Sequence, residues 1–591
     1  MFVMISYSIF IGFIYVNDKE KIIEIDNEFK LNLYEDEITF KKKQNKVKAI
    51  ALYYPEYNNI SISKYFNVSE KYKSLNYGNI KRLIEAQVKL AKRHEIYGFA
   101  ISFYLFKYDF YNHLTINIFL NTINFPFFLN WRNDELETIE IHDIELFVEK
   151  IKKYMVSDNY IKIMKKPILS IQNPYKYLNI QNIILTIRKE AKKKINEIFI
   201  IYPFTGNFNN KFFLKEFDAA YDHSKIDLFP HTMYNNSNIL YYSGIIYKNL
   251  VLNELNFDFP LLRSCYLNNN KFNDYNPEKF YISNKIIFNF GGLKKIKSFV
   301  FIDSWNNYKI GNYLEPDQKY GFASINSFSK SILNIPFRDN KYYFNNNRTL
   351  IAVQLHAYYE DLSFELINKI NLIPLKYDLF ISTVSKTKKK VIEKFLWNST
   401  ANKYEIRIFE NKGRDVLPFI NQMKKNFKNY KYICHIHTKK SSHNIFLGDN
   451  WREYIYSNLL GSKDIISDIL YNFESNQKIG IIFPEPFYDI IKENKGFDNI
   501  NFFLNRENKN NMNLIIKMLF KKYKLGEKLI FPVGNMFWSR TKAIYQIFYL
   551  RLTYPKELNQ TNETIMHAIE RIWIYLVKLN GFYYKTIFKH Y

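Results

Sequence analysis

The stretch YKYICHIHTKK, residues 430–440, is an apolar run that ends in a polar turn. Three similar runs precede it, with helical segments between them: LIAVQLHAYY (350–359), YDLFIST (377–383) and YEIRIFENKGRD (404–415). Alternation of strands with helices is typical of a parallel sheet. These four runs therefore predict the start of a doubly wound, Rossmann-like α/β domain. Two later runs, KIGIIFPEP and FPVGNMFW, are expected to add strands to it.

The turns that follow these strands are the expected ligand site of this domain. Ligands of doubly wound folds bind beyond the carboxyl ends of the strands. We therefore expect His356, Thr383, the NKGRD turn and the HTKKS turn to share one crevice.

The N-terminal half shows a second alternation. The polar, Asn-rich segment FRDNKYYFNNNRT (337–349) reads as an interdomain linker. Before it, strand-like runs recur across residues 47–305, and eight of them predict a (β/α)8 barrel. The runs are VKAIALYY, YGFAISFY, FPFFLNW, KPILSIQ, EIFIIYP, FDAAYD, FPLLRSCY and KSFVFIDSW. The expected organisation is an extension (1–46), a barrel (47–336), a linker (337–349) and an α/β domain (350–591).

The composition favours acidic partners but not nucleic acid. Lys and Arg outnumber Asp and Glu by 84 to 57, a net charge of +27, in a chain of 591 residues. Such a charge favours phosphate-bearing donors or an anionic membrane face. The abundance of Lys, Asn, Ile, Phe and Tyr is also what an AT-rich genome produces, and no basic stripe interleaved with aromatic residues points to nucleic acid.

Two further features indicate the compartment. The two cysteines form no disulfide framework, which suggests a reducing compartment. The apolar N-terminal run MFVMISYSIFIGFIY is short for a membrane span, and we expect a strand-rich extension, with a membrane-surface anchor as the alternative. No other segment is long and apolar enough to cross a bilayer. We expect a cytoplasmic protein, peripheral at the inner membrane face if it is anchored.

The barrel carries aromatic, amide and acidic residues just after its strands. Active sites of such barrels lie at this rim. Aromatic rings can cover the flat face of a sugar, and amides and acids can bind its hydroxyls, so the rim predicts glycan binding; ordinary polar loops are the alternative. The candidates are Glu56, Trp131, Asn133, Asp134, Asp303, Trp305, Asn306 and Glu315.

The NKGRD turn has the features of a phosphate site. It follows a strand and opens a helix, whose free N–H groups favour phosphate. Gly413 permits a tight turn after Asn411, and Arg414 can make bidentate contacts to a diphosphate. Asp415 could either cap the helix or hold a sugar hydroxyl.

The HTKKS turn has cations where a metal site would need acids. It carries His437, Lys439 and Lys440 but no carboxylate, and Mg²⁺ prefers carboxylate oxygen. Lysine could neutralise a departing diphosphate directly. If a group is transferred from a diphosphate-linked donor at this turn, we expect the reaction to need no metal ion and no other cofactor. A zinc site on His435, His437 and His443 lacks a clear fourth ligand, and a solvated basic turn remains the alternative.

Two motifs near the C-terminus suggest a site for an acceptor sugar and a general base that could deprotonate it. GNMFWSR places Asn535 before Trp538, which could stack on a sugar or lie in the core. If a sugar is transferred with inversion at its anomeric carbon, one general base is needed near the acceptor hydroxyl. HAIER supplies Glu570 as the first choice, followed by Asp415 and His567; a structural ion pair is the alternative for Glu570.

Several ordered motifs in residues 47–335 resemble the WbsX-like family, whose barrel is similar to that of endo-α-mannosidases. They are YYPEYN, LAKRHEIYGF, WRND, KKPILSI and LEPDQKYGFA. The sequence departs from that pattern at the two catalytic glutamates, where Asn307 and Ile310 stand. Glycoside hydrolysis needs two carboxyl groups, so the resemblance implies a glycan-binding or degenerate barrel.

The second half, about residues 350–590, resembles the rhamnan synthesis protein F family. The motifs are LHAYYED, YDLFIST, NKGRDVLPF, HIHTKKS, DNWREY, GIIFPEP, GNMFWSR and HAIER. The resemblance implies a GT-A-like glycosyltransferase of cell-surface polysaccharide (O-antigen in lipopolysaccharide, rhamnan or capsule). Its substrates would be a nucleotide sugar and a lipid-linked glycan. The competing functions are a glycoside hydrolase acting through the barrel and a non-catalytic glycan-binding protein.

Overall fold

The computed structural model divides the chain into two compact units, residues 31–339 and residues 1–30 with 340–591. The expected domains, 47–336 and 350–591, fall inside these units. The residues that the structure describes are 21–23, 35–40, 47–55, 80–104, 110–121, 123–133, 140–177, 179–204, 215–222, 245–246, 249, 260–267, 275–289, 299–317, 319–337, 349–440, 445–487, 506–520, 523–526, 529–550 and 564–588.

The first unit contains a nearly closed parallel barrel, as the eight runs predicted. The pairing order is β10-β11-β2-β3-β4-β6-β7-β8-β9. The two ends of this order belong to one run, because β9 and β10 flank Arg263, whose carbonyl accepts from the N–H of Phe301 at 2.9 Å. The strands are β2 (Lys48–Tyr53), β3 (Ile96–Tyr104), β4 (Phe127–Arg132), β6 (Lys166–Ile171), β7 (Phe199–Phe204), β8 (Ala219–Asp222), β9 (Leu261–Leu262), β10 (Ser264–Cys265) and β11 (Phe299–Ile302).

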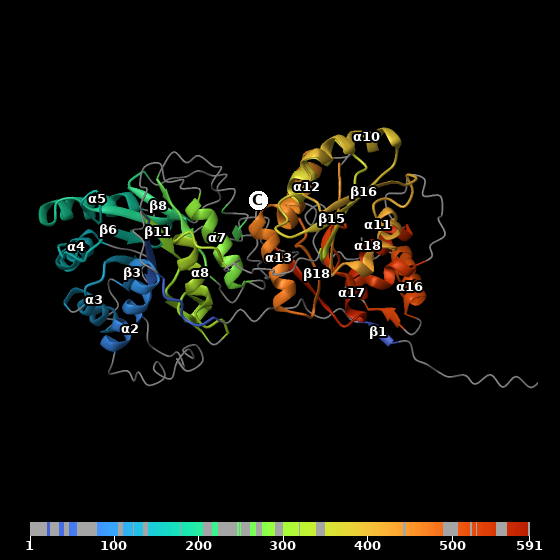
Figure 1. Cartoon of the computed structure of the whole chain (residues 1–591). Coiled ribbons are helices and arrows are strands. Elements are labelled where there is room, and N and C mark those ends of the chain that lie inside the picture. The colour runs from blue at the N-terminus through green and yellow to red at the C-terminus, as the bar shows by residue number, and fades with distance from the viewer. Residues whose placement is uncertain are drawn as a thin grey trace, which may run out of the picture. The chain divides into compact units, whose positions relative to one another are not determined.

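Amphipathic helices cover the outside of these strands (Figure 1). In α2 the buried residues Ile84, Val88 and Ala91 recur at the spacing of one helical face. The helices are α2 (Ile80–Arg93), α3 (Phe110–Asn121), α4 (Ile141–Met155), α5 (Ile180–Lys194), α7 (Pro277–Asn289) and α8 (Ala323–Ile332).

The second unit is built on a seven-stranded sheet of order β16-β15-β14-β17-β20-β18-β21. Only β20 runs antiparallel to its neighbours. The strands are β14 (Ile351–His356), β15 (Tyr377–Thr383), β16 (Lys403–Ile408), β17 (Tyr432–His437), β18 (Ile479–Pro484), β20 (Phe537–Arg540) and β21 (Tyr583–Ile587). All six residues of β14 are buried, which suits a strand covered on both faces.

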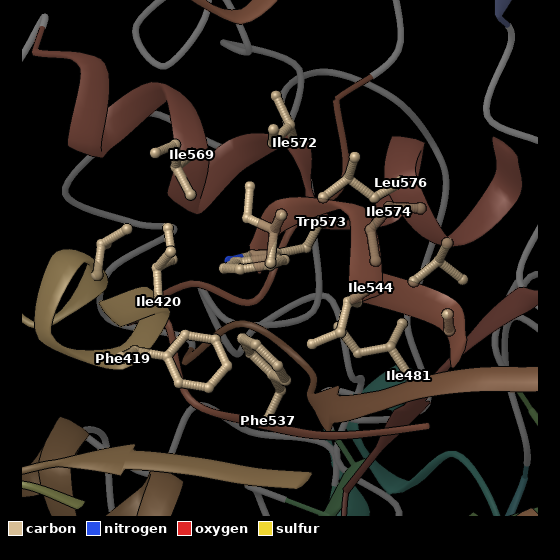
Figure 2. Close-up of a cluster of buried hydrophobic side chains, with 14 of the residues drawn as sticks. Phe419, Ile420, Ile481, Phe537, Ile544, Ile569, Ile572, Trp573, Ile574 and Leu576 are labelled. Atoms are coloured by element: carbon tan, nitrogen blue, oxygen red, sulfur yellow. The ribbon is translucent and has the colours of Figure 1, made fainter. Parts of the chain in front are cut away.

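Two groups of helices cover this sheet (Figure 1). The first comprises α9 (Ser363–Ile370), α10 (Lys386–Phe395), α12 (Ile445–Leu460) and α13 (Lys463–Ser475). The second comprises α11 (Val416–Met423), α16 (Arg506–Leu519), α17 (Thr541–Ile544) and α18 (Ile565–Leu579). In the core beneath the second group, Phe419 of α11 lies against Phe537 and Trp573 (Figure 2). This core fixes α11, which Asp415 directly precedes, and α18, which carries Glu570.

The expected extension is shared between the units. In the second unit, β1 (Lys21–Ile23) pairs with β19 (Tyr523–Leu525), and in the first Glu35 bridges to Gly321. The apolar run of residues 1–15 and most of the expected linker lie outside the described residues. No described helix has both the length and the apolar character that crossing a bilayer requires.

Candidate functional site

The candidate site lies where the strand order of the second unit reverses. β14 lies between β15 and β17, so the chain moves one way across the sheet and then returns to the other side of β14. His356 and His437 are partners at the carboxyl ends of β14 and β17. Ligands of α/β sheets bind outside such a reversal point. The structure thus brings together the turns that the sequence predicted would share a crevice.

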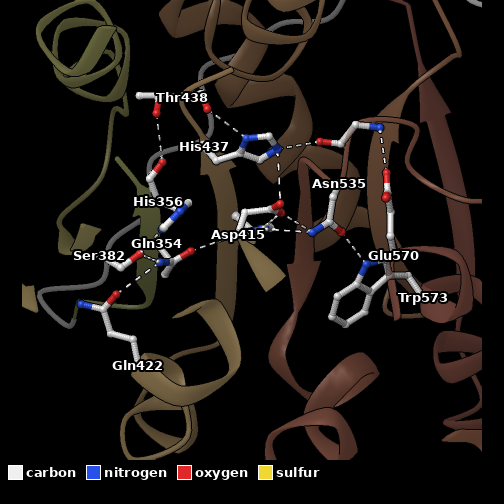
Figure 3. Close-up of polar contacts among 12 residues, drawn as sticks. Gln354, His356, Ser382, Asp415, Gln422, His437, Thr438, Asn535, Glu570 and Trp573 are labelled. Carbon is white, nitrogen blue, oxygen red and sulfur yellow. Dashed lines mark hydrogen bonds and ion pairs between the residues drawn. The ribbon is translucent and has the colours of Figure 1, made fainter. Parts of the chain in front are cut away.

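Asp415 lies at the centre of a buried polar cluster (Figure 3). Its Oδ2 accepts a hydrogen bond from Asn535 Nδ2 at 2.6 Å and lies 3.3 Å from His435 Nε2 and 3.8 Å from His437 Nε2. Burial alone would raise the pKa of Asp415, but His437, His435 and Asn535 outweigh it and hold the pKa well below the ordinary value. Asp415 is therefore an ionised carboxylate.

The hydrogen-bond direction in this cluster is set from two ends. The carbonyl of Ile381 can only accept, so Gln422 Nε2 donates to it at 3.0 Å. Gln422 Oε1 then accepts from Gln354 Nε2, and Gln354 Oε1 must accept from His435 Nδ1 at 2.8 Å. Burial lowers the pKa of His435, and the hydrogen bond to Gln354 places a proton on its Nδ1.

The other end of the network is Trp573. Its indole N–H can only donate, and it donates to Asn535 Oδ1 at 2.7 Å. The Asn535 amide group therefore faces Asp415 and His435 with its N–H₂ side. Both ring nitrogens of His435 thus have protein partners, which argues against the zinc alternative. No set of three metal-ligating side chains occurs among the described residues, and His443 lies outside them.

Two left-handed turns border the cluster. Gly413 and Arg414 have φ values of 71° and 53°, and Gly534 and Asn535 have 95° and 53°. Such values are strained for residues other than glycine, and strain of this kind clusters at functional sites. The second turn is held on both sides, because the Gly534 carbonyl accepts from His437 Nε2 at 2.9 Å and its N–H donates to Glu570 at 3.3 Å.

Cationic side chains surround the two acids. Lys439 interacts electrostatically with Glu570, Asp415 and Arg414, and Arg571 interacts with Glu570. Burial raises the pKa of Glu570 and lowers that of Lys439. Three cations around two carboxyl groups leave a surplus of positive charge, which suits an anionic ligand.

Trp451 belongs to this site, although the sequence gave it no role. Lys439 Nζ lies 3.8 Å above the centre of its ring. A Cβ on Gly534 would lie 3.3 Å from its Cζ2, so the left-handed turn requires glycine for space as well as for φ. Trp451 stands in the DNWREY motif, which was the only signal available in the sequence.

The comparisons with known families agree with these two halves. Residues 70–276 match the family described as Glycosyltransferase WbsX, and residues 328–582 match the family described as Rhamnan synthesis protein F. Both resemblances are confirmed. The rhamnan synthesis F segment contains all the residues of the polar cluster described above.

The curated relatives match only part of the chain. Two proteins of Xanthomonas campestris pv. campestris, each named uncharacterized protein WxcX, are 27% identical over 281 residues. The match covers 46% of this chain and 37% of each relative, so the chain spans little more than a third of the curated relatives it matches.

Solved structures resemble the chain weakly. A GH99 endo-alpha-mannosidase from Bacteroides thetaiotaomicron is 10% identical at a TM-score of 0.32, covering 48% of this chain and 95% of that one. GH5_18 from Streptomyces cattleya is 5% identical at 0.32, covering 61% and 99%. At these TM-scores the likenesses carry no argument, so the barrel is inferred from the strand pairing alone.

Four expected residues of the rhamnan synthesis F segment lie elsewhere or have other partners. His567 caps α18, since its Nδ1 lies 2.8 Å from the Thr564 hydroxyl. Trp538 is 0% exposed and its indole N–H donates to the Leu459 carbonyl, so it cannot stack on a sugar. The Lys440 ammonium pairs with Asp361, and the side chain of Asn411 is exposed.

In the barrel, the structure buries the tryptophans that were expected to bind sugar. Trp131 and Trp305 are 1% and 0% exposed and pack against Phe147 and Phe99. Neither ring has a free face. Glu56 and Asp134 lie outside the described residues.

The polar candidates of the barrel bind the protein's own loops. Asn133 exchanges two hydrogen bonds with the backbone of Asn173, and Asn306 does so with Tyr54. Asp303 accepts from Asn312. Burial raises the pKa of Glu315 from 4.5 to about 8, and Gln87 and Trp305 lie beside it. These residues shape the rim, and their contacts show no shared sugar site.

Asn535→Gly tests the cluster without straining the turn, because glycine tolerates φ 53°. The substitution leaves Trp573 Nε1 and one oxygen of Asp415 without their partner. We expect a loss of about 1–3 kcal/mol in the free energy of unfolding, measured by urea denaturation. An unchanged midpoint would show that the amide is not part of a tight network.

Proposed function

We propose that the second unit is a glycosyltransferase of bacterial cell-surface polysaccharide biosynthesis. It would transfer a sugar from a nucleotide-sugar donor to a glycan, with a lipid-linked oligosaccharide as the acceptor. The family descriptions support the reaction class. The observation that carries the proposal is the cation-rich cluster around Asp415 and Glu570 at the reversal point of the sheet.

The fold proposed for this unit is Rossmann-like and of the GT-A kind. The order β16-β15-β14-β17 is a parallel half of a doubly wound sheet, and the remaining strands form a mixed half around antiparallel β20. Helices on both faces agree with this assignment.

The donor diphosphate would bind between Lys439 and Arg414. Both cations belong to the electrostatic cluster, and Gly413 places a left-handed turn before the first turn of α11. As the bond between the anomeric carbon and the diphosphate oxygen breaks, its electron pair leaves with the diphosphate. Fixed cations stabilise this developing charge. We therefore propose transfer without a metal ion or other cofactor.

The two acids would have different roles. Glu570, with its raised pKa, is the better general base, because base strength rises with pKa. It would remove the proton from the acceptor hydroxyl as that oxygen attacks the anomeric carbon. Asp415, held ionised by its neighbours, is a weak base and would bind a sugar hydroxyl. His567 is engaged in the helix cap and is the weakest candidate.

For the barrel we propose glycan binding, not hydrolysis. Asn307 and Ile310 cannot act as acid and nucleophile, and Ile310 is 47% exposed on a short turn. A hydrolase would release sugar from an oligosaccharide without any donor, and we expect no such release.

The test of the transferase compares Lys439→Ala with wild type on a panel of nucleotide sugars, with and without a chelator. We expect donor turnover to fall by about 10²–10³-fold in the variant and to be insensitive to the chelator. Lys542→Ala is the matched control, because this exposed lysine follows β20 at the opposite edge of the sheet. Equal activity of Lys439→Ala and Lys542→Ala would refute the proposed diphosphate site, and no turnover by wild type with any donor would refute the transferase.

A further inference from the structure

The outer face of α10 and the turn that follows it form an unusual surface. Trp397 lies in the 3-10 turn η7 (Leu396–Asn398) and is 80% exposed. Lys386, Lys390 and Lys394 are exposed on α10, and none has an ion pair with a described residue. An exposed indole with several unpaired lysines beside it forms a patch that is both apolar and basic, and exposed apolar surface rimmed by polar residues marks interaction sites.

These four residues lie on one side of the helix. The spacing of four residues places the three lysines in one stripe along the axis of α10, and Trp397 follows three residues after Lys394, in the turn that continues the helix. The stripe is about 16 Å long at 1.5 Å per residue. Glu393 also borders it, but that charge is offset by Lys389, whose Nζ lies 3.7 Å from its carboxylate. The face therefore carries a net charge of about three positive units.

We propose that this stripe (Lys386, Lys390, Lys394 and Trp397) docks the protein on an anionic membrane surface. Tryptophan is enriched at the level of the lipid headgroups, where its ring is partly wet and partly apolar. Lysines beside it are attracted to acidic headgroups. A double-stranded nucleic acid or an acidic protein would use the charge but would not need a protruding indole in line with it.

The edge strand of the sheet extends the surface. β16 contacts α10 and exposes Tyr404 by 56% and Ile408 by 42%. Aromatic and aliphatic side chains on a strand that contacts α10 add apolar area that can enter the interface. The inference does not rest on the proposed transferase, although a surface-bound enzyme would meet a lipid-linked acceptor there.

The experiment is flotation of the full chain with vesicles. We expect binding to phosphatidylcholine–phosphatidylserine vesicles and little binding to pure phosphatidylcholine. The triple variant Lys386→Gln, Lys390→Gln, Lys394→Gln should bind at least about tenfold more weakly, given the typical contribution of each lysine near an anionic surface. Trp397→Ala should also weaken binding while leaving the helical circular dichroism unchanged.

The matched control removes the same charge elsewhere. Lys89, Lys189 and Lys192 are exposed on helices of the first unit, and their triple change to glutamine should retain vesicle binding. Equal loss in both triple variants would mean that only total charge matters and would overturn the proposal. So would wild-type binding to polyglutamate or RNA that depends on the stripe as strongly as vesicle binding does. Donor turnover in solution should not change in the stripe variants, which separates this test from that of the transferase.

Discussion

Glu570→Gln is expected to lower the turnover of sugar transfer by about 10²–10⁴-fold, the usual contribution of a general base. Glutamine keeps the shape and can still accept from the Gly534 N–H, so the turn beside it should persist. The change removes only the proton acceptor. Transfer kinetics at saturating donor would measure it, and donor affinity, followed by titration calorimetry, should change little.

The pH dependence provides an independent check of this role. Burial raises the pKa of Glu570, so wild-type activity should fall on the acid side at a pH above the ordinary value of 4.5. In Asp415→Asn that acid limb should move to lower pH, because the Asp415 charge contributes to the raised pKa of Glu570. A Glu570→Gln enzyme with near wild-type turnover would exclude Glu570 as the base and leave Asp415 as the candidate.

Glu315→Gln is expected to stabilise the barrel at alkaline pH. Burial raises the pKa of Glu315 from 4.5 to about 8, and its Oε2 has no hydrogen-bond partner in the described part of the barrel. The folded state therefore holds this proton between pH 4.5 and 8 while the unfolded state has lost it. Stability falls as pH rises through this window, by on the order of 5 kcal/mol at about 1.4 kcal/mol per pKa unit.

Glutamine cannot ionise, so the variant should lack this part of the pH dependence. Thermal unfolding of wild type and variant at pH 5 and pH 8 measures it, since other titrating groups cancel in the difference. We expect similar stability at pH 5 and a clearly more stable variant at pH 8. Glu85→Gln, on an exposed position of α2, serves as the control. If the difference between variant and wild type is the same at both pH values, Glu315 does not carry a raised pKa.

The strands could be predicted because burial on both faces imposes long apolar runs. VKAIALYY and LIAVQLHAYY each leave little choice between strand and loop, and both became strands, β2 and β14. The last strand, β21, was not predicted, because YYKTI is short and only partly buried. A strand at the margin of a sheet has too little apolar pattern to stand out.

The side-chain orientations could not be predicted. Trp131 ends a strand, and successive side chains of a strand point to opposite faces. Sequence alone did not tell whether its ring would enter the barrel or pack under α4, as it does against Phe147. His567 is the third residue after Thr564, a capping spacing that was present in the sequence but was read as chemistry. The partners of Asp415 come from β17 and from the turn at Asn535, which only the fold brings together.

The row of amides and rings that runs from the Ile381 carbonyl to the Trp573 indole has a consequence for any attempt to redesign this protein. Because its two terminal groups cannot exchange roles, reversing any one member forces two like groups to face each other in the interior. Substitutions there should be tolerated only when the donors and acceptors of the whole row are changed together, because all its hydrogen bonds run in one direction.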